Sequence, residues 1–352
     1  MVKILSVVGA RPQFIKAAPV SRALRQAGID EVLIHTGQHY DANMSDIFFD
    51  ELGIPQPWAN LNVGSGSHAE QTAHMLLKLE PLMVQHAPDA VLVYGDTNST
   101  LAGALVAAKL GFKLAHVEAG LRSFNRTMPE EHNRVLTDHS ADLLFCPTQN
   151  AVNLLAREGI TRGVYMVGDT MFDAVLQFGD LARQRSTILQ DLGLEAKNYL
   201  LATVHRPYNT DVPDNLSAIV CALADSGQTV VFPVHPRTRQ RLPALNAPNL
   251  RLIEPLGYLD MLLLEQQARC ILTDSGGVQK EAYFFGVPCL TLRPETEWIE
   301  TLEGGWNVLV GADYARILTQ LQAEAPQGVP PAVFGDGHAA QRIASILLEV
   351  LA

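Results

Sequence analysis

The sequence alternates short apolar runs, rich in Val, Ile and Leu, with longer amphipathic stretches, and this pattern starts twice. Short apolar runs are typical of strands buried on both faces, and amphipathic stretches between them are typical of crossover helices. The alternation predicts βαβ units and parallel sheets. In the first half, strands are predicted at residues 2–9, 31–37, 90–96, 113–119, 142–148 and 163–169. In the second half, they are predicted at residues 199–205, 229–235, 250–256, 268–274 and 288–294.

The restart of the pattern divides the 352 residues into two domains. At about 100–200 residues per domain, the length also fits two. We expect an N-terminal Rossmann-like domain over residues 1–168 and a C-terminal one over 169–336, with a hinge at Gly168 and a last helix, 337–352, that packs back on the first domain. The predicted fold class is α/β, with two doubly wound Rossmann-like domains facing a cleft. Open parallel sheets bind ligands at the carboxyl ends of their strands, so we place the active site there.

Charge and composition exclude several classes of partner. The chain has 26 Lys and Arg against 37 Asp and Glu, a net charge of −11, so it has no general positive field for a nucleic acid. No run of 18 apolar residues predicts a membrane span, and the first residues do not read as a signal peptide. The four cysteines show no CxxC spacing, which favours reduced, buried thiols. We therefore expect a cytoplasmic protein with no nucleic-acid or membrane partner.

The common cofactor motifs are also missing from the sequence. No GxGxxG follows the first strand, and no GxxxxGK[ST] occurs anywhere, so neither the dinucleotide fingerprint nor the Walker A loop is present. Four histidines, at positions 39, 116, 205 and 235, lack the i, i+4 spacing of a metal-binding helix. We predict that the protein uses no cofactor and no metal.

A phosphate site is predicted where the strand at 268–274 runs into Ser275-Gly276-Gly277 and then a helix. Free backbone N–H groups at a helix N-terminus attract anions, and glycines permit close approach. Arg11 and Lys16, in the turn after the first strand, would supply cations from the other domain. Cations and backbone donors together suit a diphosphate.

Three carboxylates, Asp96, Glu118 and Glu130, follow strands of the first half. Carboxylates that converge on a site with cations suggest proton abstraction from carbon or acid–base chemistry on a sugar. Polar side chains follow other predicted strands as well. These further candidates are His39, His205, Arg206, His235, Arg237 and Glu281.

Nine segments stand out in order along the chain. They are GARPQFIK, HTGQHYDANMSDIFF, YGDTNSTLAGAL, HVEAGLRS, MPEEHNR, TVHR, PVHPR, TDSGGVQKE and GDGHAAQRI. Together they resemble the non-hydrolysing UDP-N-acetylglucosamine 2-epimerases. The resemblance implies the two-domain arrangement of GT-B glycosyltransferases, with UDP bound by the second domain, and we also expect a homodimer.

The resemblance implies a reaction and a set of roles. UDP leaves C1 of the sugar while the C2 proton is removed, giving 2-acetamidoglucal, and UDP adds back after protonation on the opposite face. UDP-N-acetylglucosamine and UDP-N-acetylmannosamine are thereby interconverted, for surface polysaccharide precursors. The implied catalytic residues are Asp96, Glu118, Glu130 and His205. The implied substrate-binding residues are Arg11, Lys16, His39, Arg206, His235, Arg237, Ser275, Gly276, Gly277 and Glu281.

Three alternatives stay open at this point. The chain also resembles the branch that epimerises UDP-2,3-diacetamido-2,3-dideoxy-glucuronate, whose carboxylate would want an extra cation, and Arg122, Arg126 and Arg206 are candidates. An inverting GT-B glycosyltransferase would share the fold and the UDP site. A non-catalytic UDP-sugar sensor would bind the substrate without chemistry.

Overall fold

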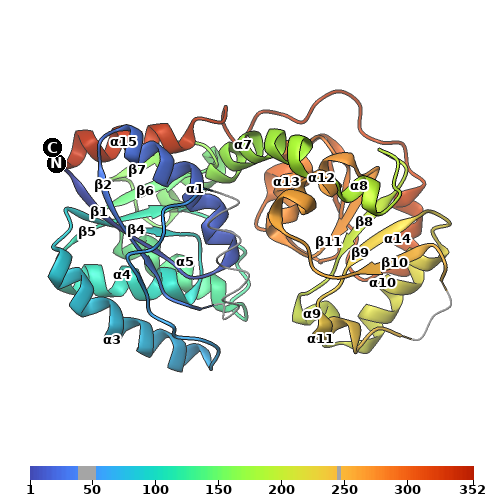
Figure 1. The fold of residues 1–352 in the computed structure, drawn as a ribbon, viewed down its shortest axis with the longest axis horizontal. Helices are drawn as coiled ribbons and strands as arrows, with labels where there is room; N and C mark the ends of the chain where they lie inside the picture. The colour runs from blue at the N-terminus through green and yellow to red at the C-terminus, as the bar shows by residue number, and fades with distance from the viewer. Residues whose placement is uncertain (39–52, 244–246) are drawn as a thin grey trace. The chain divides into compact units, whose positions relative to one another are not determined.

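The computed structural model describes residues 1–38, 53–243 and 247–352, apart from the side chains of Pro236 and Arg237. The chain divides into two compact units (Figure 1). Unit 1 comprises Met1–Leu176 and Ala332–Ala352, and unit 2 comprises Gln177–Pro331. Helix α7 (Thr170–Arg185) runs through the boundary.

Unit 1 contains a parallel sheet of seven strands among its described residues, in the order β3-β2-β1-β4-β5-β6-β7. The order reverses between β1 and β4, which is the point where ligands bind in doubly wound sheets. Its strands are β1 (Lys3–Val8), β2 (Asp30–His35), β3 (Ala59–Asn60), β4 (Ala90–Tyr94), β5 (Lys113–Val117), β6 (Leu143–Cys146) and β7 (Val164–Met166). Its helices besides α7 are α1 (Arg11–Gln26), α3 (His68–His86), α4 (Asn98–Leu110), α5 (Pro129–Ser140), α6 (Gln149–Arg157) and α15 (Ala339–Leu351).

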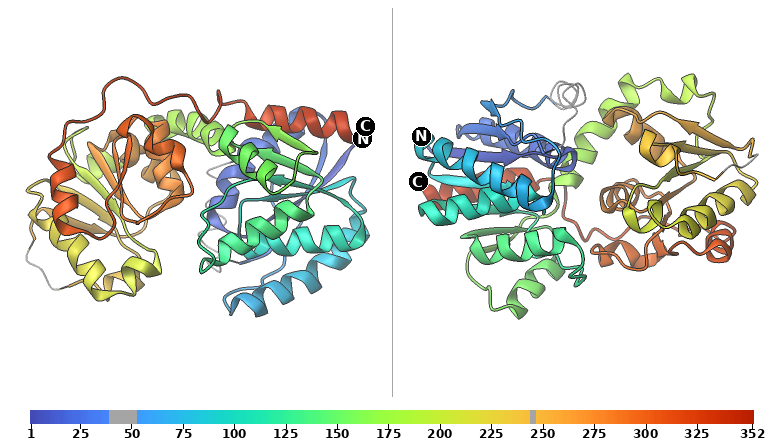
Figure 2. Two further views of the ribbon diagram at one scale, coloured as in Figure 1. Left: turned by 180° about the vertical axis from the view of Figure 1, so that it is seen from behind. Right: turned by 90° about the horizontal axis from the view of Figure 1, so that it is seen from below.

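The sheet of unit 1 is covered on both faces, which explains why its strands are apolar throughout rather than alternating. Helices α3, α4 and α5 cover one face, and α1 and α15 lie side by side on the other (Figures 1 and 2). Met75, Leu79 and Met83 recur at helical spacing on α3 and are fully buried against Val91 and Val93 of β4. This periodic apolar stripe fixes the face that α3 turns to the core.

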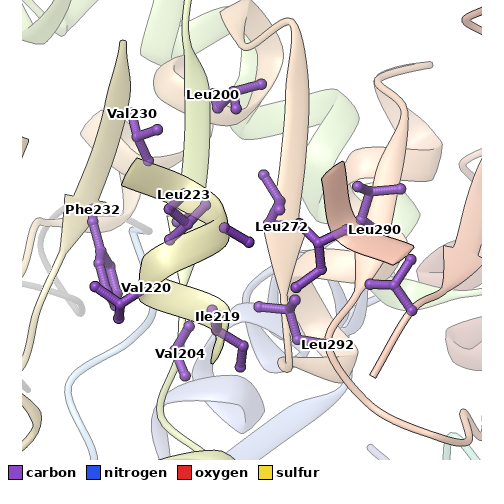
Figure 3. Close-up of a cluster of buried hydrophobic side chains, with 14 of the residues drawn as sticks. Leu200, Val204, Ile219, Val220, Leu223, Val230, Phe232, Leu272, Leu290 and Leu292 are labelled. Atoms are coloured by element: carbon purple, nitrogen blue, oxygen red, sulfur yellow. The ribbon is translucent and has the colours of Figure 1, made fainter. Parts of the chain in front are cut away.

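Unit 2 repeats the plan with a parallel sheet in the order β10-β9-β8-β11-β12-β13. Its core packs α10 and α14 against this sheet, with Ile219, Leu223 and Phe232 fully buried (Figure 3). Its strands are β8 (Leu200–Thr203), β9 (Val230–Pro233), β10 (Leu250–Ile253), β11 (Cys270–Thr273), β12 (Cys289–Thr291) and β13 (Asn307–Leu309). Its helices are α8 (Ile188–Asp191), α9 (Pro207–Thr210), α10 (Pro213–Asp225), α11 (Pro236–Arg239), α12 (Tyr258–Gln267), α13 (Gly276–Phe284), α14 (Tyr314–Leu321) and a 3₁₀ helix at Ile299–Gly305.

The predicted fold class, α/β with two doubly wound Rossmann-like domains, is confirmed. All eleven predicted strands form. The structure adds β3 and β13, which are edge strands of two and three residues. Pairing with β2 and β12 defines them, and runs this short carry no periodic signal. In the part of the chain that the structure describes, no helix is both long enough and apolar enough to cross a bilayer.

A buried carboxylate on α7 caps the last helix. The residue that precedes α15, His338, makes no side-chain cap, and Asp173 supplies the missing acceptor from 166 residues away. Asp173 Oδ1 accepts from the N–H of Ala339 at 3.1 Å, and Oδ2 accepts from that of Ala340 at 2.7 Å. Helix N-termini carry unsatisfied N–H groups, so this contact ties the C-terminal segment to the rest of unit 1.

We predict that Asp173→Ala lowers the free energy of unfolding by about 1–2 kcal/mol, the usual loss of a helix N-cap. Asp173→Asn should cost clearly less, because its amide oxygen still accepts one of the two N–H groups. Urea unfolding followed by circular dichroism measures both. Equal stability of the alanine variant and the wild type would show that the cap contributes nothing.

Candidate active site

The first strand-to-helix turn places two cations in unit 1. Gly9 is required there, because a Cβ would lie 2.0 Å from Thr36 Oγ1. Gln13 Oε1 accepts from the N–H groups of Gly9 and Ala10 at 2.8 and 3.1 Å, which closes the turn and lets α1 begin at Arg11. Arg11 is half-buried in the first turn, and Lys16 is buried little more than one turn later. The turn therefore directs Lys16 inward beneath the ends of the strands.

Lys16 forms a buried ion pair with Glu118, which follows β5. Lys16 Nζ lies 2.5 Å from Glu118 Oε1, and the two side chains are only 9% and 6% exposed. Gly95, at the end of β4, lies against this pair, since a Cβ there would be 3.2 Å from Lys16 Nζ. Glu118 has a left-handed backbone with φ of 72°, which costs a residue other than glycine about 1–2 kcal/mol. Phe145 O holds it by accepting the N–H groups of residues 118 and 119, each at 3.1 Å.

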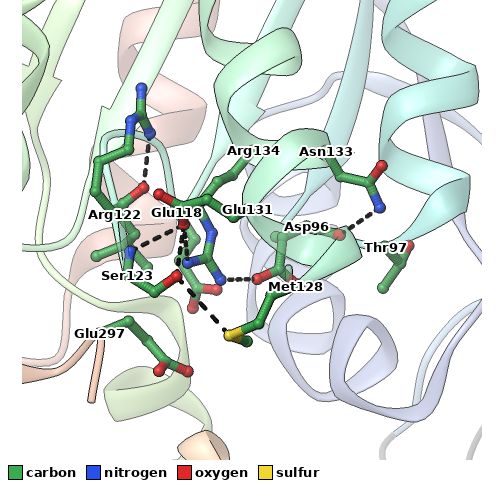
Figure 4. A network of polar contacts seen from close by, with 12 residues as sticks. Asp96, Thr97, Glu118, Arg122, Ser123, Met128, Glu131, Asn133, Arg134 and Glu297 are labelled. Carbon is green, nitrogen blue, oxygen red and sulfur yellow. Dashed lines mark hydrogen bonds and ion pairs between the residues drawn. The ribbon is translucent and has the colours of Figure 1, made fainter. Parts of the chain in front are cut away.

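Asp96 belongs to a second charged cluster, beside Glu118 in Figure 4. Arg134 on α5 donates from Nη2 to Asp96 Oδ2 and from Nη1 to Glu131 Oε2, the latter at 2.9 Å. Asn133 Nδ2 donates to the Asp96 carbonyl at 2.9 Å, so α5 fixes both the backbone and the side chain of Asp96. The Asp96 side chain is 27% exposed, whereas that of Arg134 is 3% exposed. Asp96 therefore keeps a face that a ligand can reach.

Glu131 anchors the loop that follows Glu118, and it is not among the predicted site residues. It accepts from the N–H of Ser123 at 2.9 Å, the Ser123 hydroxyl at 2.8 Å and the N–H of Phe124 at 2.9 Å. Burial alone would raise the pKa of Glu131, but these hydrogen bonds and the Arg134 charge outweigh it and hold the pKa below its ordinary value. The predicted residue, Glu130, is half-buried one position earlier. The i, i+3 spacing of Glu131 and Arg134 was the signal available in the sequence.

In unit 2, the predicted phosphate segment opens helix α13. Ser275 is the N-cap, and its hydroxyl accepts from the N–H of Val278 at 3.5 Å. A Cβ on Gly276 would lie 2.6 Å from Glu297 Oε1, so packing against Glu297 requires glycine there. Glu281 is buried on the same helix, and its Oε1 accepts from the Tyr258 hydroxyl at 3.0 Å. The carboxylate of Glu281 is thus held in one orientation at the nucleotide-binding edge expected for this sheet.

Asp274 organises the end of β8 from the end of β11. Its fully buried carboxylate accepts from the N–H groups of His205 and Arg206 at 3.1 and 3.0 Å, and from Asn209 Nδ2 at 2.9 Å. His205 Nδ1 lies 3.3 Å from Asp274 Oδ1, while the His205 side chain stays 53% exposed. Asp274 therefore orients an imidazole that stays more than half exposed.

The predicted site residues fall into two groups. In unit 1, Lys16, Asp96 and Glu118 come together at the carboxyl ends of β1, β4 and β5, an arrangement that can move protons beside a fixed positive charge. In unit 2, His205, Ser275 and Glu281 follow β8 and β11. His235 follows β9 and is exposed. His39 and the side chain of Arg237 lie outside the described residues. Within the described ranges, no cluster of three or more His, Cys, Asp or Glu side chains has the geometry of a metal site.

Comparison with known proteins adds a family. A family model described as UDP-N-acetylglucosamine 2-epimerase matches residues 22–348. A Methanococcus maripaludis protein described as a UDP-N-acetylglucosamine 2-epimerase homolog is 53% identical, over 98% of this chain and 99% of its own. The UDP-2,3-diacetamido-2,3-dideoxy-D-glucuronate 2-epimerase of Pseudomonas aeruginosa is 48% identical, over 99% and 100%. The Methanocaldococcus jannaschii UDP-GlcNAc 2-epimerase, in complex with UDP-GlcNAc and UDP, superposes with a TM-score of 0.90 at 44% identity, covering 99% and 100%.

We predict that Glu131→Gln lowers the free energy of unfolding at pH 7 by about 1–3 kcal/mol, because the amide nitrogen cannot accept the backbone N–H groups that the carboxylate satisfies. A carboxyl group whose pKa is lowered by folding stabilises the fold at pH values above its ordinary pKa of 4.5. It loses that contribution as the pH falls through its folded pKa. The difference in the free energy of unfolding between Glu131→Gln and the wild type should therefore decrease below pH 4.5. Glu80→Gln, at an exposed position, is the control. A difference that does not change with pH would contradict this account.

Proposed function

The chain belongs to the UDP-N-acetylglucosamine 2-epimerase family, and we propose that it interconverts UDP-N-acetylglucosamine and UDP-N-acetylmannosamine without hydrolysis. The observation that carries the proposal is the buried Lys16–Glu118 pair beside Asp96, because it brings a cation and two carboxylates to the strand ends. We also propose a homodimer, supported by Leu77 and Val84 on α3, which are 71% and 59% exposed. A reducing, cytoplasmic location is supported by the four free cysteines.

The proposed chemistry is elimination followed by addition. A carboxylate removes the C2 proton, the C1–O bond breaks with its electron pair leaving on UDP, and a C1=C2 double bond forms as 2-acetamidoglucal. Readdition of UDP with protonation at the opposite face of C2 completes the epimerisation. Two faces need two proton-transfer groups, which accounts for several carboxylates in one site. Asp96, Glu118 and Glu130 share these roles.

The departing UDP dianion needs stabilisation as its negative charge develops. We assign this to Arg11 and Lys16 of unit 1 and to His205, Arg206, His235 and Arg237 of unit 2. The N-terminus of α13, with Ser275, Gly276 and Gly277, offers backbone N–H groups to phosphate oxygens. Glu281, fixed by Tyr258, is an acceptor for a nucleoside hydroxyl. His39 completes the proposed substrate-binding set.

A second candidate substrate is UDP-2,3-diacetamido-2,3-dideoxy-glucuronate, supported by the 48% identical Pseudomonas relative. Its carboxylate requires a cation that a ligand can reach. Arg122 is already engaged, because it donates from Nε and Nη2 to Glu158 at 2.7 and 2.8 Å and is only 5% exposed. Arg126 is exposed and Arg206 is half-buried, so these two remain candidates. Proton NMR of turnover on each sugar nucleotide distinguishes the two substrates.

We predict that incubation with UDP-N-acetylglucosamine in D₂O places deuterium at C2 of the sugar, because the glucal is reprotonated from solvent. Mass spectrometry and NMR of the recovered nucleotide sugar measure the exchange. A GT-B glycosyltransferase would instead transfer or release the sugar without C2 exchange. A UDP-sugar sensor would bind without any exchange, and either result would reject the epimerase proposal for this substrate.

We predict that Asp96→Asn, Glu118→Gln and Glu130→Gln each reduce turnover on the order of 10²-fold or more, because each removes a proton-transfer group at nearly constant shape. UDP affinity by calorimetry should change little. Glu349→Gln, an exposed carboxylate on α15, is the matched control and should turn over like the wild type. A site variant that keeps wild-type turnover would mark its residue as structural.

A further inference from the structure

A completely buried histidine and aspartate lie beneath the unit 1 site, and the proposed mechanism does not use them. His116 is on β5 and Asp138 is on α5, and both side chains are 0% exposed. His116 Nδ1 lies 2.7 Å from Asp138 Oδ1. Asp138 Oδ2 accepts from the N–H of Gly120 at 3.1 Å and from Arg122 Nη1 at 2.7 Å. The aspartate therefore joins a strand histidine to the loop that follows Glu118.

The other ring nitrogen of His116 faces a second loop. His116 Nε2 lies 2.7 Å from the carbonyl oxygen of Gly95, the residue before Asp96. A carbonyl oxygen only accepts, so Nε2 must carry a proton. Nδ1 faces a carboxylate, because Arg122 and the Gly120 N–H both favour the charged form of Asp138. A carboxylate also only accepts, so Nδ1 must carry a proton as well.

We propose that Asp138 holds His116 as a doubly protonated imidazolium, and that the pair positions the two loops that carry Asp96 and Glu118. The role for Asp96 and Glu118 rests on the proposed function, whereas the protonation state rests on the hydrogen bonds alone.

The charged groups around His116 come from several elements. Arg122, from the loop after β5, also pairs with Glu158 at the end of α6, and Glu158 in turn lies 3.0 Å from His139 Nε2 on α5. The Glu158 side chain is 28% exposed, whereas those of His116, Asp138 and Arg122 are at most 1% exposed. A buried cation needs a partner of opposite sign, and Asp138 contacts both His116 and Arg122.

The pKa of Asp138 favours its ionised form. Burial alone would raise the pKa of Asp138, but His116 and Arg122 outweigh it and hold that pKa below its ordinary value. Burial and the Asp138 charge raise the pKa of the nearby Cys146 thiol on β6, so it stays neutral and adds no charge to the cluster.

The hydrogen bonds of His116 and Asp138 connect the two loops that carry the proposed proton-transfer residues. One continuous chain runs from the Gly95 carbonyl through His116 and Asp138 to the Gly120 N–H. Gly95 and Gly120 flank the proposed proton-transfer residues in loops after adjacent strands. The backbones of Gly95 and Glu118 are both left-handed, with φ of 62° and 72°, so both residues depart from strand geometry. Proton transfer tolerates only small displacements, and Asp138 is therefore a positioning residue.

The protonation state can be tested in the wild type without any variant. Long-range ¹H–¹⁵N NMR on protein with ¹⁵N-labelled histidine reports whether each ring nitrogen carries a proton. His116→Gln assigns the signal. At pH 8 we expect both nitrogens of His116 to be protonated, whereas an exposed histidine is neutral there. A neutral His116 ring at pH 8 would overturn the imidazolium assignment.

The positioning role is tested with Asp138→Asn, which removes the charge at constant size. We expect kcat for C2 exchange to fall about 10–100-fold with a smaller change in KM. The pH profile should gain a titration between pH 5 and 8 as His116 is released, which a merely structural role would not produce. Glu158→Gln is the matched control: it removes a carboxylate that contacts the Arg122 side chain but neither His116 nor Asp138, and kcat should stay within about twofold.

Each outcome separates this proposal from the proposed function. Wild-type protein without C2 exchange would reject the function and leave the NMR result to decide the protonation state. A folded Asp138→Asn with wild-type kcat and pH profile would overturn the positioning role. If Asp138→Asn does not fold, His116→Gln is the second variant, since it breaks the bond to Gly95 and should reduce kcat similarly. Unchanged kcat in that variant would likewise overturn the positioning role.

Discussion

Burying Lys16 against Glu118 is the interaction on which the site of unit 1 depends. Removing two charges from water costs several kcal/mol per ion unless each finds its partner in good geometry. At 2.5 Å, with both side chains less than a tenth exposed, the pair meets that condition. Gly95 leaves room for the pair, since a Cβ there would lie 3.2 Å from Lys16 Nζ, and Phe145 O holds Glu118 in a left-handed backbone. The strand ends of the sheet therefore make the pair possible, and the pair in turn fixes where Glu118 lies.

The carboxylates of the two units divide into two kinds. Glu131 and Asp274 are buried and accept several N–H groups, so their task is to hold the shape of a loop. Asp96 bonds to a side chain, Arg134, and keeps 27% of its own side chain exposed. A carboxylate whose oxygens are already filled by backbone donors has little capacity to accept a proton from a substrate. The number of backbone donors on a carboxylate is therefore one factor that decides whether it can react.

This division of the carboxylates explains which features of the site could be predicted from the sequence alone. The strand ends were predictable, because apolar periodicity locates strands and parallel strands end at one edge, which places Asp96 and Glu118 near each other. The sequence could not show which of Glu130 and Glu131 is buried. Neighbouring residues on a helix point about 100° apart, and only the tertiary fold decides which of them faces the core. Gly276 was predicted for ligand approach, and the structure adds a second constraint, because a Cβ there would lie 2.6 Å from Oε1 of Glu297, 21 positions away. Such nonlocal packing leaves no mark in the local pattern.

In both units, a buried aspartate connects loops that follow neighbouring strands. A parallel ladder binds strands to each other, and its backbone hydrogen bonds reach only the first residues beyond the strand ends. In unit 2, Asp274 at the end of β11 collects the N–H groups that follow β8. In unit 1, Asp138 links the loops after β4 and β5 through His116 and Gly120. In both aspartates each of the two carboxylate oxygens makes a hydrogen bond. The geometry of the reacting groups in each unit therefore depends on a buried aspartate that lies behind them.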